Sequence, residues 1–121
     1  MAISSILVVD DSPTDRQHLS DMLSKNGFKV STADSAEDAL AKVKQLRPDL
    51  VLMDVVMPGQ NGFQATRTLA RDESTKDIPV ILCTCKGQET DKVWGMRQGA
   101  RDYIVKPVDP TELMAKIHAF D

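Results

Sequence analysis

Five short apolar runs alternate with five segments of helical periodicity, and this alternation constrains the fold more than any other feature of the chain. The apolar runs are residues 6–9, 30–33, 50–53, 80–83 and 103–105, and the second run is the weakest. The first, third and fourth runs are continuous and rich in branched side chains, which is typical of strands covered on both faces. The chain therefore predicts an α/β fold in which a parallel sheet carries helices on both faces.

Each segment between these runs places apolar residues on one face of a helix. The predicted faces are Leu19, Met22 and Leu23; Ala36, Ala39, Leu40, Val43 and Leu46; Phe63, Thr66, Leu69 and Ala70; Val93, Met96 and Ala100; and Leu113, Ile117 and Phe120. Ser12 and Asp109 each precede a proline, which favours a helix N-cap followed by proline at the first helical position. Gly27 and Gly99 lie where helices are expected to end.

Length and charge exclude several classes of protein. A chain of 121 residues suits one domain, and no apolar stretch approaches the roughly 20 residues that cross a bilayer. The net charge of −3 argues against a nucleic-acid-binding module. Asp10 and Asp11 directly follow the first apolar run, so we expect no export signal, no membrane insertion and a cytoplasmic protein with reduced thiols.

On a strand, Cys83 and Cys85 would point to opposite faces and could not pair with each other.

Polar side chains follow four of the five apolar runs. Asp10 and Asp11 follow the first run, Asp54 the third, Thr84 the fourth and Lys106 the fifth. Each of them alone is common at a cap, a turn or a solvated strand end. Because the carboxyl ends of parallel strands share one edge of the sheet, the five side chains are expected to face one pocket.

Such a pocket favours phosphoryl chemistry. Three carboxylates repel one another, so Lys106 and a hard divalent cation such as Mg²⁺ are expected among them. A carboxylate kept ionised beside these cations can attack phosphorus and form an aspartyl phosphate, which predicts Asp54 as the nucleophile. The Thr84 hydroxyl and Lys106 would contact the phosphoryl oxygens, whose charge must be neutralised during transfer.

Four stretches resemble the response-regulator receiver domain of two-component signalling: residues 6–11, 49–62, 79–84 and 99–107. The resemblance covers essentially the whole chain. It implies a flavodoxin-like (CheY-like) doubly wound sheet of five parallel strands in the order 2-1-3-4-5, with five helices. It also implies one receiver domain over residues 1–121 and no output domain.

The resemblance assigns a role to each polar residue of the pocket. It implies that Asp54 is the phosphoacceptor, and that Asp10, Asp11, Asp54 and the backbone carbonyl of Val56 bind Mg²⁺. Thr84 and Lys106 are implied to contact the phosphoryl group.

Two further features follow from the same resemblance. Tyr103 corresponds to the aromatic switch residue that turns inward when Thr84 moves toward the phosphoryl group. The peptide bond between Lys106 and Pro107 is implied to be cis.

The resemblance also implies how the protein acts. A sensor histidine kinase, or its phosphotransfer domain, would phosphorylate a switch that is not a classical enzyme and whose output is binding to another protein. Residues 61–67 and 89–100 are similar to stand-alone receivers of the chemosensory system for twitching motility by type IV pili. A phosphate sink that drains the kinase without an effector is the alternative within signalling.

Two other classes fit the residues less well. A haloacid-dehalogenase-like phosphohydrolase needs a second aspartate two residues after the nucleophile, where this chain has Val56. A flavodoxin-like nucleotide binder needs a phosphate loop after the first strand, where Asp10 and Asp11 would repel phosphate.

Within the receiver family, Cys85 stands where alanine or glycine is usual. Because Val56 offers no group to position water, we expect no unusually fast self-hydrolysis.

Overall fold

Strands and helices alternate along residues 2–121, the part of the chain that the computed structural model describes. The strands are β1 (Ser5–Val9), β2 (Lys29–Ala33), β3 (Leu50–Met53), β4 (Val80–Thr84) and β5 (Asp102–Val105). The helices are α1 (Pro13–Lys25), α2 (Ala36–Leu46), α3 (Gly62–Arg71), α4 (Glu89–Arg97) and α5 (Pro110–His118). Among the described residues, no helix has the length and apolar character needed to cross a membrane.

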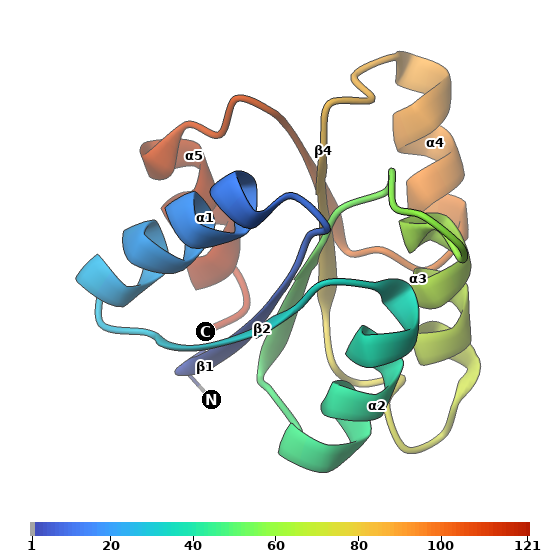
Figure 1. The fold of residues 1–121 in the computed structure, drawn as a ribbon, viewed down its shortest axis with the longest axis horizontal. Coiled ribbons are helices and arrows are strands. Elements are labelled where there is room, and N and C mark those ends of the chain that lie inside the picture. The colour runs from blue at the N-terminus through green and yellow to red at the C-terminus, as the bar shows by residue number, and fades with distance from the viewer. Residues whose placement is uncertain (1) are drawn as a thin grey trace.

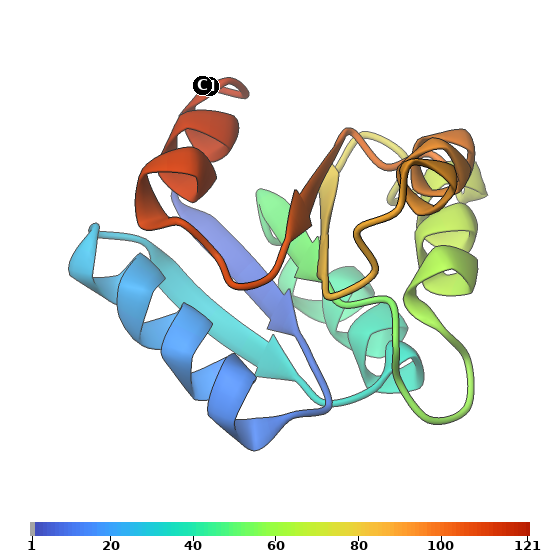
Figure 2. The same ribbon diagram turned by 90° about the horizontal axis from the view of Figure 1, so that it is seen from above.

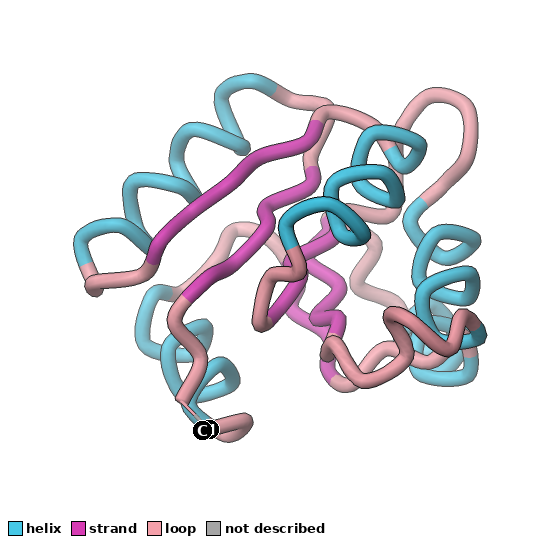
Figure 3. Tube along the Cα trace, turned by 90° about the horizontal axis from the view of Figure 1, so that it is seen from below, coloured by secondary structure: helices cyan, strands magenta, loops and turns pink. Residues whose placement is uncertain are grey.

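The five strands form one parallel sheet in the order β2-β1-β3-β4-β5, which confirms the expected topology. Helices α1 and α5 cover one face of the sheet, and α2, α3 and α4 cover the other (Figures 1 and 2). The strands therefore form the middle of three layers (Figure 3).

Alternate side chains of each central strand enter opposite cores. Leu7 and Val9 of β1 pack in the core under α2 and α3, whereas Ile6 and Val8 pack in the core under α1 and α5. Every residue of β3 and β4 is buried, as expected for runs covered on both faces.

Polar caps begin the helices where the sequence indicates them. The Ser12 side chain accepts a hydrogen bond from the first turn of α1, and the Asp109 side chain accepts one from the first turn of α5. In both helices a proline directly follows the capping residue. Gly99 has a φ of 106°, and a Cβ there would lie 2.5 Å from that of Ala70. The C-terminal end of α4 therefore packs directly on α3.

The prediction for the buried face of α4 is wrong for Val93 and Met96, whereas Ala100, just beyond the helix, is buried as predicted. Val93 and Met96 are both 45% exposed, and their neighbour Trp94 is 49% exposed. The buried residue is Gly95, where a Cβ would lie only 2.6 Å from the Leu82 side chain. Helix α4 thus approaches the sheet through a residue without a side chain, and its large apolar groups face outward. Leu46, predicted on the buried face of α2, is also half exposed at the last position of that helix.

Candidate functional site

The polar residues that follow the strands meet at one edge of the sheet. The Asp54 backbone N–H donates to the Val9 carbonyl at 2.9 Å, and the Lys106 N–H donates to the Thr84 carbonyl at 2.9 Å. These bonds extend the parallel pairing one residue past the strands. Asp54 is therefore held beside the end of β1, and Lys106 beside the end of β4.

Three carboxylates converge at this edge. One oxygen each from Asp10, Asp11 and Asp54 lies within 4.8 Å of the other two. The side chain of Asp10 is 1% exposed and that of Asp54 is 9% exposed, whereas Asp11 is open to solvent. Converging carboxylate oxygens with one open side fit a hard divalent cation that keeps some of its water.

Lys106 provides a positive charge inside this cluster. Its Nζ lies 2.6 Å from Asp10 Oδ2, 3.0 Å from Asp15 Oδ2 and 3.5 Å from Asp54 Oδ2. Burial lowers the pKa of Lys106, but its hydrogen bonds to Asp10 and Asp15 and the nearby Asp54 charge raise it more. The pKa therefore lies above its ordinary value, and the side chain stays protonated.

Burial is also the main influence on the pKa of Asp54. Burial raises the pKa of its carboxyl, and the Asp10 charge raises it further. The Lys106 charge, the Thr84 hydroxyl and the Val55 N–H, which donates to Asp54 Oδ1 at 2.7 Å, all act in the opposite direction. The net pKa is raised, so the ionised carboxylate is stabilised incompletely by the protein alone.

Thr84 and Tyr103 both contact the backbone of Lys86, in the loop between β4 and α4. The buried Thr84 hydroxyl accepts a hydrogen bond from the Lys86 N–H at 3.4 Å. The Tyr103 hydroxyl donates to the Lys86 carbonyl at 2.6 Å, with its ring buried. Burial raises the pKa of Tyr103 to about 12, so this hydroxyl remains a donor. The peptide bond between Lys106 and Pro107 is cis, the isomer that the resemblance implies.

Val56 lies two residues beyond Asp54, in the loop that leads to α3, and its side chain is exposed. This loop is fixed from behind by Gly62, whose N–H donates to the Val55 carbonyl at 2.9 Å. A Cβ on Gly62 would lie 2.0 Å from the Asp54 carbonyl oxygen. Only glycine therefore allows α3 to begin this close to the backbone of Asp54.

No sequence pattern assigns a role to Asp15, Arg16 or Gly62. Asp15 reaches Lys106 from the first turn of α1, and the Arg16 guanidinium donates to the Asp10 carbonyl at 2.8 Å. Asp15 and Arg16 lie within α1 rather than directly after a strand. The rule that polar residues at the ends of parallel strands share one edge of the sheet therefore does not identify them.

The two cysteines flank Thr84 in different environments. Cys83 is buried, and burial raises the pKa of its thiol to about 12. Cys85 is exposed at the start of the loop before α4. Neither forms a disulfide, and only Cys83 lies within β4.

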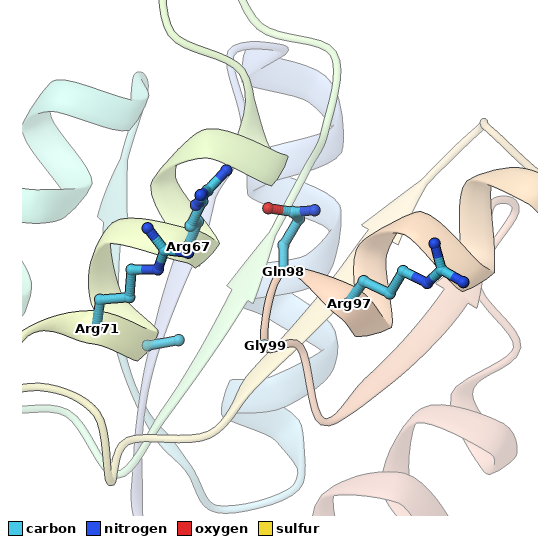
Figure 4. Close-up of a pocket in the computed structure, with 6 residues that line it drawn as sticks. Arg67, Arg71, Arg97, Gln98 and Gly99 are labelled. Carbon is cyan, nitrogen blue, oxygen red and sulfur yellow. The ribbon is translucent and has the colours of Figure 1, made fainter.

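A separate cavity of about 370 Å³ lies between the C-terminal ends of α3 and α4 and is lined by Arg67, Ala70, Arg71, Arg97, Gln98 and Gly99 (Figure 4). Arg71 and Arg97 lie in the last turns of their helices, where cations offset the negative end of the helix dipole. The Arg97 guanidinium also points away from Arg67 and Arg71 (Figure 4).

Comparison with known proteins agrees with this geometry. Residues 6–118 match the response regulator receiver domain. The protein PilH of Pseudomonas aeruginosa is 56% identical over 117 residues, which are 97% of this chain and 97% of PilH. The fold is similar to that of chemotaxis protein CheY4 of Vibrio cholerae, with a TM-score of 0.90 and 32% identity over 98% of both chains. It is also similar to a chain of the CheX–CheY–BeF3–Mg complex of Borrelia burgdorferi, with a TM-score of 0.90 and 28% identity over 97% of this chain and 88% of that one.

The match to the receiver domain covers most of the chain, and the identity to PilH exceeds one half. The observed strand order is the one that the motif resemblance implied. On this evidence the chain belongs to the response regulator receiver domain family of two-component signalling.

Proposed function

We propose that this chain is a stand-alone response regulator in the cytoplasm that accepts a phosphoryl group on Asp54. The donor is a sensor histidine kinase or its phosphotransfer domain. The observation that carries the proposal is the placement of Lys106 within 3.5 Å of the Asp54 carboxylate, in a cluster with Asp10 and Asp11. The match covers 97% of this chain and 97% of PilH, which supports a role similar to that of PilH.

The carboxylate cluster fits Mg²⁺ as its cofactor. Asp10, Asp11 and Asp54 would hold the ion through carboxylate oxygens, and Val56 through its backbone carbonyl. When bound, Mg²⁺ neutralises charge on the carboxylates and on phosphoryl oxygens. All the candidate ligand atoms are oxygens, which matches the preference of this ion. The related complex from Borrelia burgdorferi contains Mg²⁺ and a beryllium fluoride group, as its name states.

The protein's own side chains perform the transfer. A carboxylate oxygen of Asp54 attacks phosphorus, the phosphorus–nitrogen bond of the donor phosphohistidine breaks, and the imidazole leaves with the electron pair of that bond. Lys106 stays protonated and neutralises a phosphoryl oxygen, and the Thr84 hydroxyl donates to another. Because these groups act only on the chain's own Asp54, the protein is not a classical enzyme.

The phosphoryl signal would leave the site through Thr84 and Tyr103. Both residues contact the backbone of Lys86, so a Thr84 hydroxyl drawn toward the phosphoryl group releases one contact of that loop. The loop continues into α4, where Trp94 and its apolar neighbours are exposed. Exposed aromatic and apolar groups support a protein effector rather than a phosphate sink. By similarity to PilH, we propose that this effector belongs to the twitching-motility system.

The proposal is tested by incubating the protein with acetyl phosphate and Mg²⁺ and measuring its intact mass. The wild type is expected to gain one phosphoryl group, and the Asp54→Ala variant none. An adduct of equal yield in the variant would refute Asp54 as the acceptor. Chelation of the metal with EDTA is expected to abolish the adduct, and undiminished labelling would refute the role of Mg²⁺.

A further inference from the structure

Lys106 is shared among three carboxylates, and one of them has no place in the proposed transfer. Asp15 Oδ2 accepts a hydrogen bond from Lys106 Nζ at 3.0 Å, in addition to the 2.6 Å bond to Asp10. Asp54 is the most distant of the three acceptors, at 3.5 Å. The ammonium group is therefore held mainly by the two residues that do not receive the phosphoryl group.

The first turn of α1 fixes Asp15 in this place. The Asp15 N–H donates to the Ser12 hydroxyl at 3.2 Å, and the Ser12 N–H donates to Asp10 Oδ1 at 3.0 Å. A hydrogen-bonded ring thus runs from Asp10 through Ser12 and Asp15 to Lys106 and back. An acidic residue at this position also suits the helix dipole, but a role limited to the dipole does not require the contact with Lys106.

The two strong partners of Lys106 differ in exposure. The Asp10 side chain is 1% exposed, whereas the Asp15 side chain is 47% exposed. A cavity of about 130 Å³ opens beside the Asp15 contact, lined by Asp15, His18, Leu19, Lys106, Pro107 and Val108. Solvent weakens exposed ion pairs. The ion pair between Lys106 and Asp15 therefore breaks more easily than the pair with Asp10 when a new anion enters the site.

We infer that Asp15 is a positioning residue that restrains Lys106 in the unphosphorylated protein and so slows phosphorylation of Asp54. This inference rests on the proposed function. The phosphoryl group brings new anionic oxygens to the site. Lys106 then breaks its hydrogen bond to Asp15 and contacts these oxygens instead. The contact with Asp15 therefore stabilises the starting state and is absent from the transition state and from the phosphorylated protein.

The test compares wild type with Asp15→Asn in the presence of acetyl phosphate and Mg²⁺. Because an exposed ion pair contributes modestly, its loss is expected to raise the phosphorylation rate about threefold. The dephosphorylation rate is expected to stay within about 1.5-fold of wild type, because the contact is already broken in that state. A residue needed only for the stability of α1 would not produce this split between the two rates.

Three controls make the outcome specific. Asp15→Glu keeps the charge and is expected to phosphorylate more slowly than Asp15→Asn. Glu112→Gln removes one exposed carboxylate from the first turn of α5 and is expected to match wild type. In metal-free protein, the ¹⁵N signal of the Lys106 ammonium is expected to shift in Asp15→Asn and not in Glu112→Gln.

The results separate this inference from the proposed function. Equal phosphorylation rates in wild type and Asp15→Asn would overturn the inference alone, as would an equal increase in Glu112→Gln. An unchanged Lys106 signal would overturn it without any phosphorylation assay. A wild-type protein that gains no phosphoryl group from acetyl phosphate or from a cognate kinase would overturn the proposed function as well.

Discussion

Replacing Asp54 with asparagine is expected to stabilise the protein in the absence of metal. The Asp54 carboxylate is buried among like charges, and its pKa is raised, mainly by burial. Folding therefore brings an ionised group into a place that disfavours its charge. Asparagine has nearly the same shape and keeps an oxygen that can accept the Val55 N–H, so the substitution removes the charge and little else.

The magnitude follows from the distances around Asp54. At an effective dielectric constant of about 20, Asp10 at 4.8 Å or less repels Asp54 by about 3.5 kcal/mol or more, and Lys106 at 3.5 Å attracts it by about 4.7 kcal/mol. Asp11 also lies within 4.8 Å of Asp54, but its repulsion is weakened because solvent screens an exposed group. With burial added to this repulsion, the unfavourable effects exceed the attraction. We expect Asp54→Asn to raise the free energy of unfolding by about 1 kcal/mol.

The assay is urea unfolding followed by circular dichroism, first in EDTA and then in Mg²⁺. A cation bound to the folded state at ten times its dissociation constant stabilises it by about 1.4 kcal/mol. This gain is expected in wild type and not in Asp54→Asn, so Mg²⁺ should remove or reverse the difference between them. Asp34→Asn is the matched control: Asp34 is exposed and directly follows the edge strand β2, so this variant should lie within about 0.5 kcal/mol of wild type.

Two results would refute this reasoning. If Asp54→Asn were less stable than wild type in EDTA, the attraction of Lys106 would outweigh burial and like-charge repulsion. If Mg²⁺ stabilised both proteins equally, the ion would not bind through Asp54.

Three further predictions concern stability, each measured by urea unfolding. Tyr103→Phe removes the hydrogen bond to the Lys86 carbonyl and should lower the free energy of unfolding by about 0.5–1.5 kcal/mol; no loss would show that this bond contributes nothing. Gly62→Ala should lower it by about 2 kcal/mol, because the new Cβ would lie 2.0 Å from the Asp54 carbonyl oxygen and the better helix propensity of alanine offsets only part of the strain; a stabilised variant would contradict the close approach of α3. Asp49→Ala should lower it by about 1–2 kcal/mol at pH 7, because Asp49 Oδ2 accepts two backbone N–H groups at the start of β1. Those bonds lower the pKa of Asp49, so its contribution is present above the ordinary value of 3.8 and is lost as the pH falls through the lower folded value; a difference from wild type that persisted undiminished at pH 2 would contradict this.

Residues that follow strands could be predicted because one rule of parallel sheets places them. Asp10, Asp54, Thr84 and Lys106 each follow or end an apolar run, and the carboxyl ends of parallel strands meet at one edge. The order of the strands came from the motif resemblance, since alternation alone gives only the fold class. These residues therefore converge in the structure as expected.

Contacts that depend on helix placement could not be predicted in this way. Asp15 meets Lys106 because the Lys106 side chain extends from the end of β5 to the first turn of α1, and no periodicity in the sequence carries that information. The backbone of Lys86 receives Thr84 and Tyr103 through atoms that every residue possesses, so its side chain gives no sign of the contact.

Helix α4 shows how the same limit bears on function. An apolar stripe predicts the buried face of a helix when large side chains make the contact, but α4 meets the sheet through Gly95. A Cβ at that position would lie 3.2 Å from the Tyr103 ring, so the helix backbone rests against the residue proposed to carry the signal. With no side chain between them, a movement of the ring acts on the helix itself. Gly95 thus leaves the side chains of Val93, Trp94 and Met96 exposed on the outer face of α4. It also places the backbone of the same helix against Tyr103.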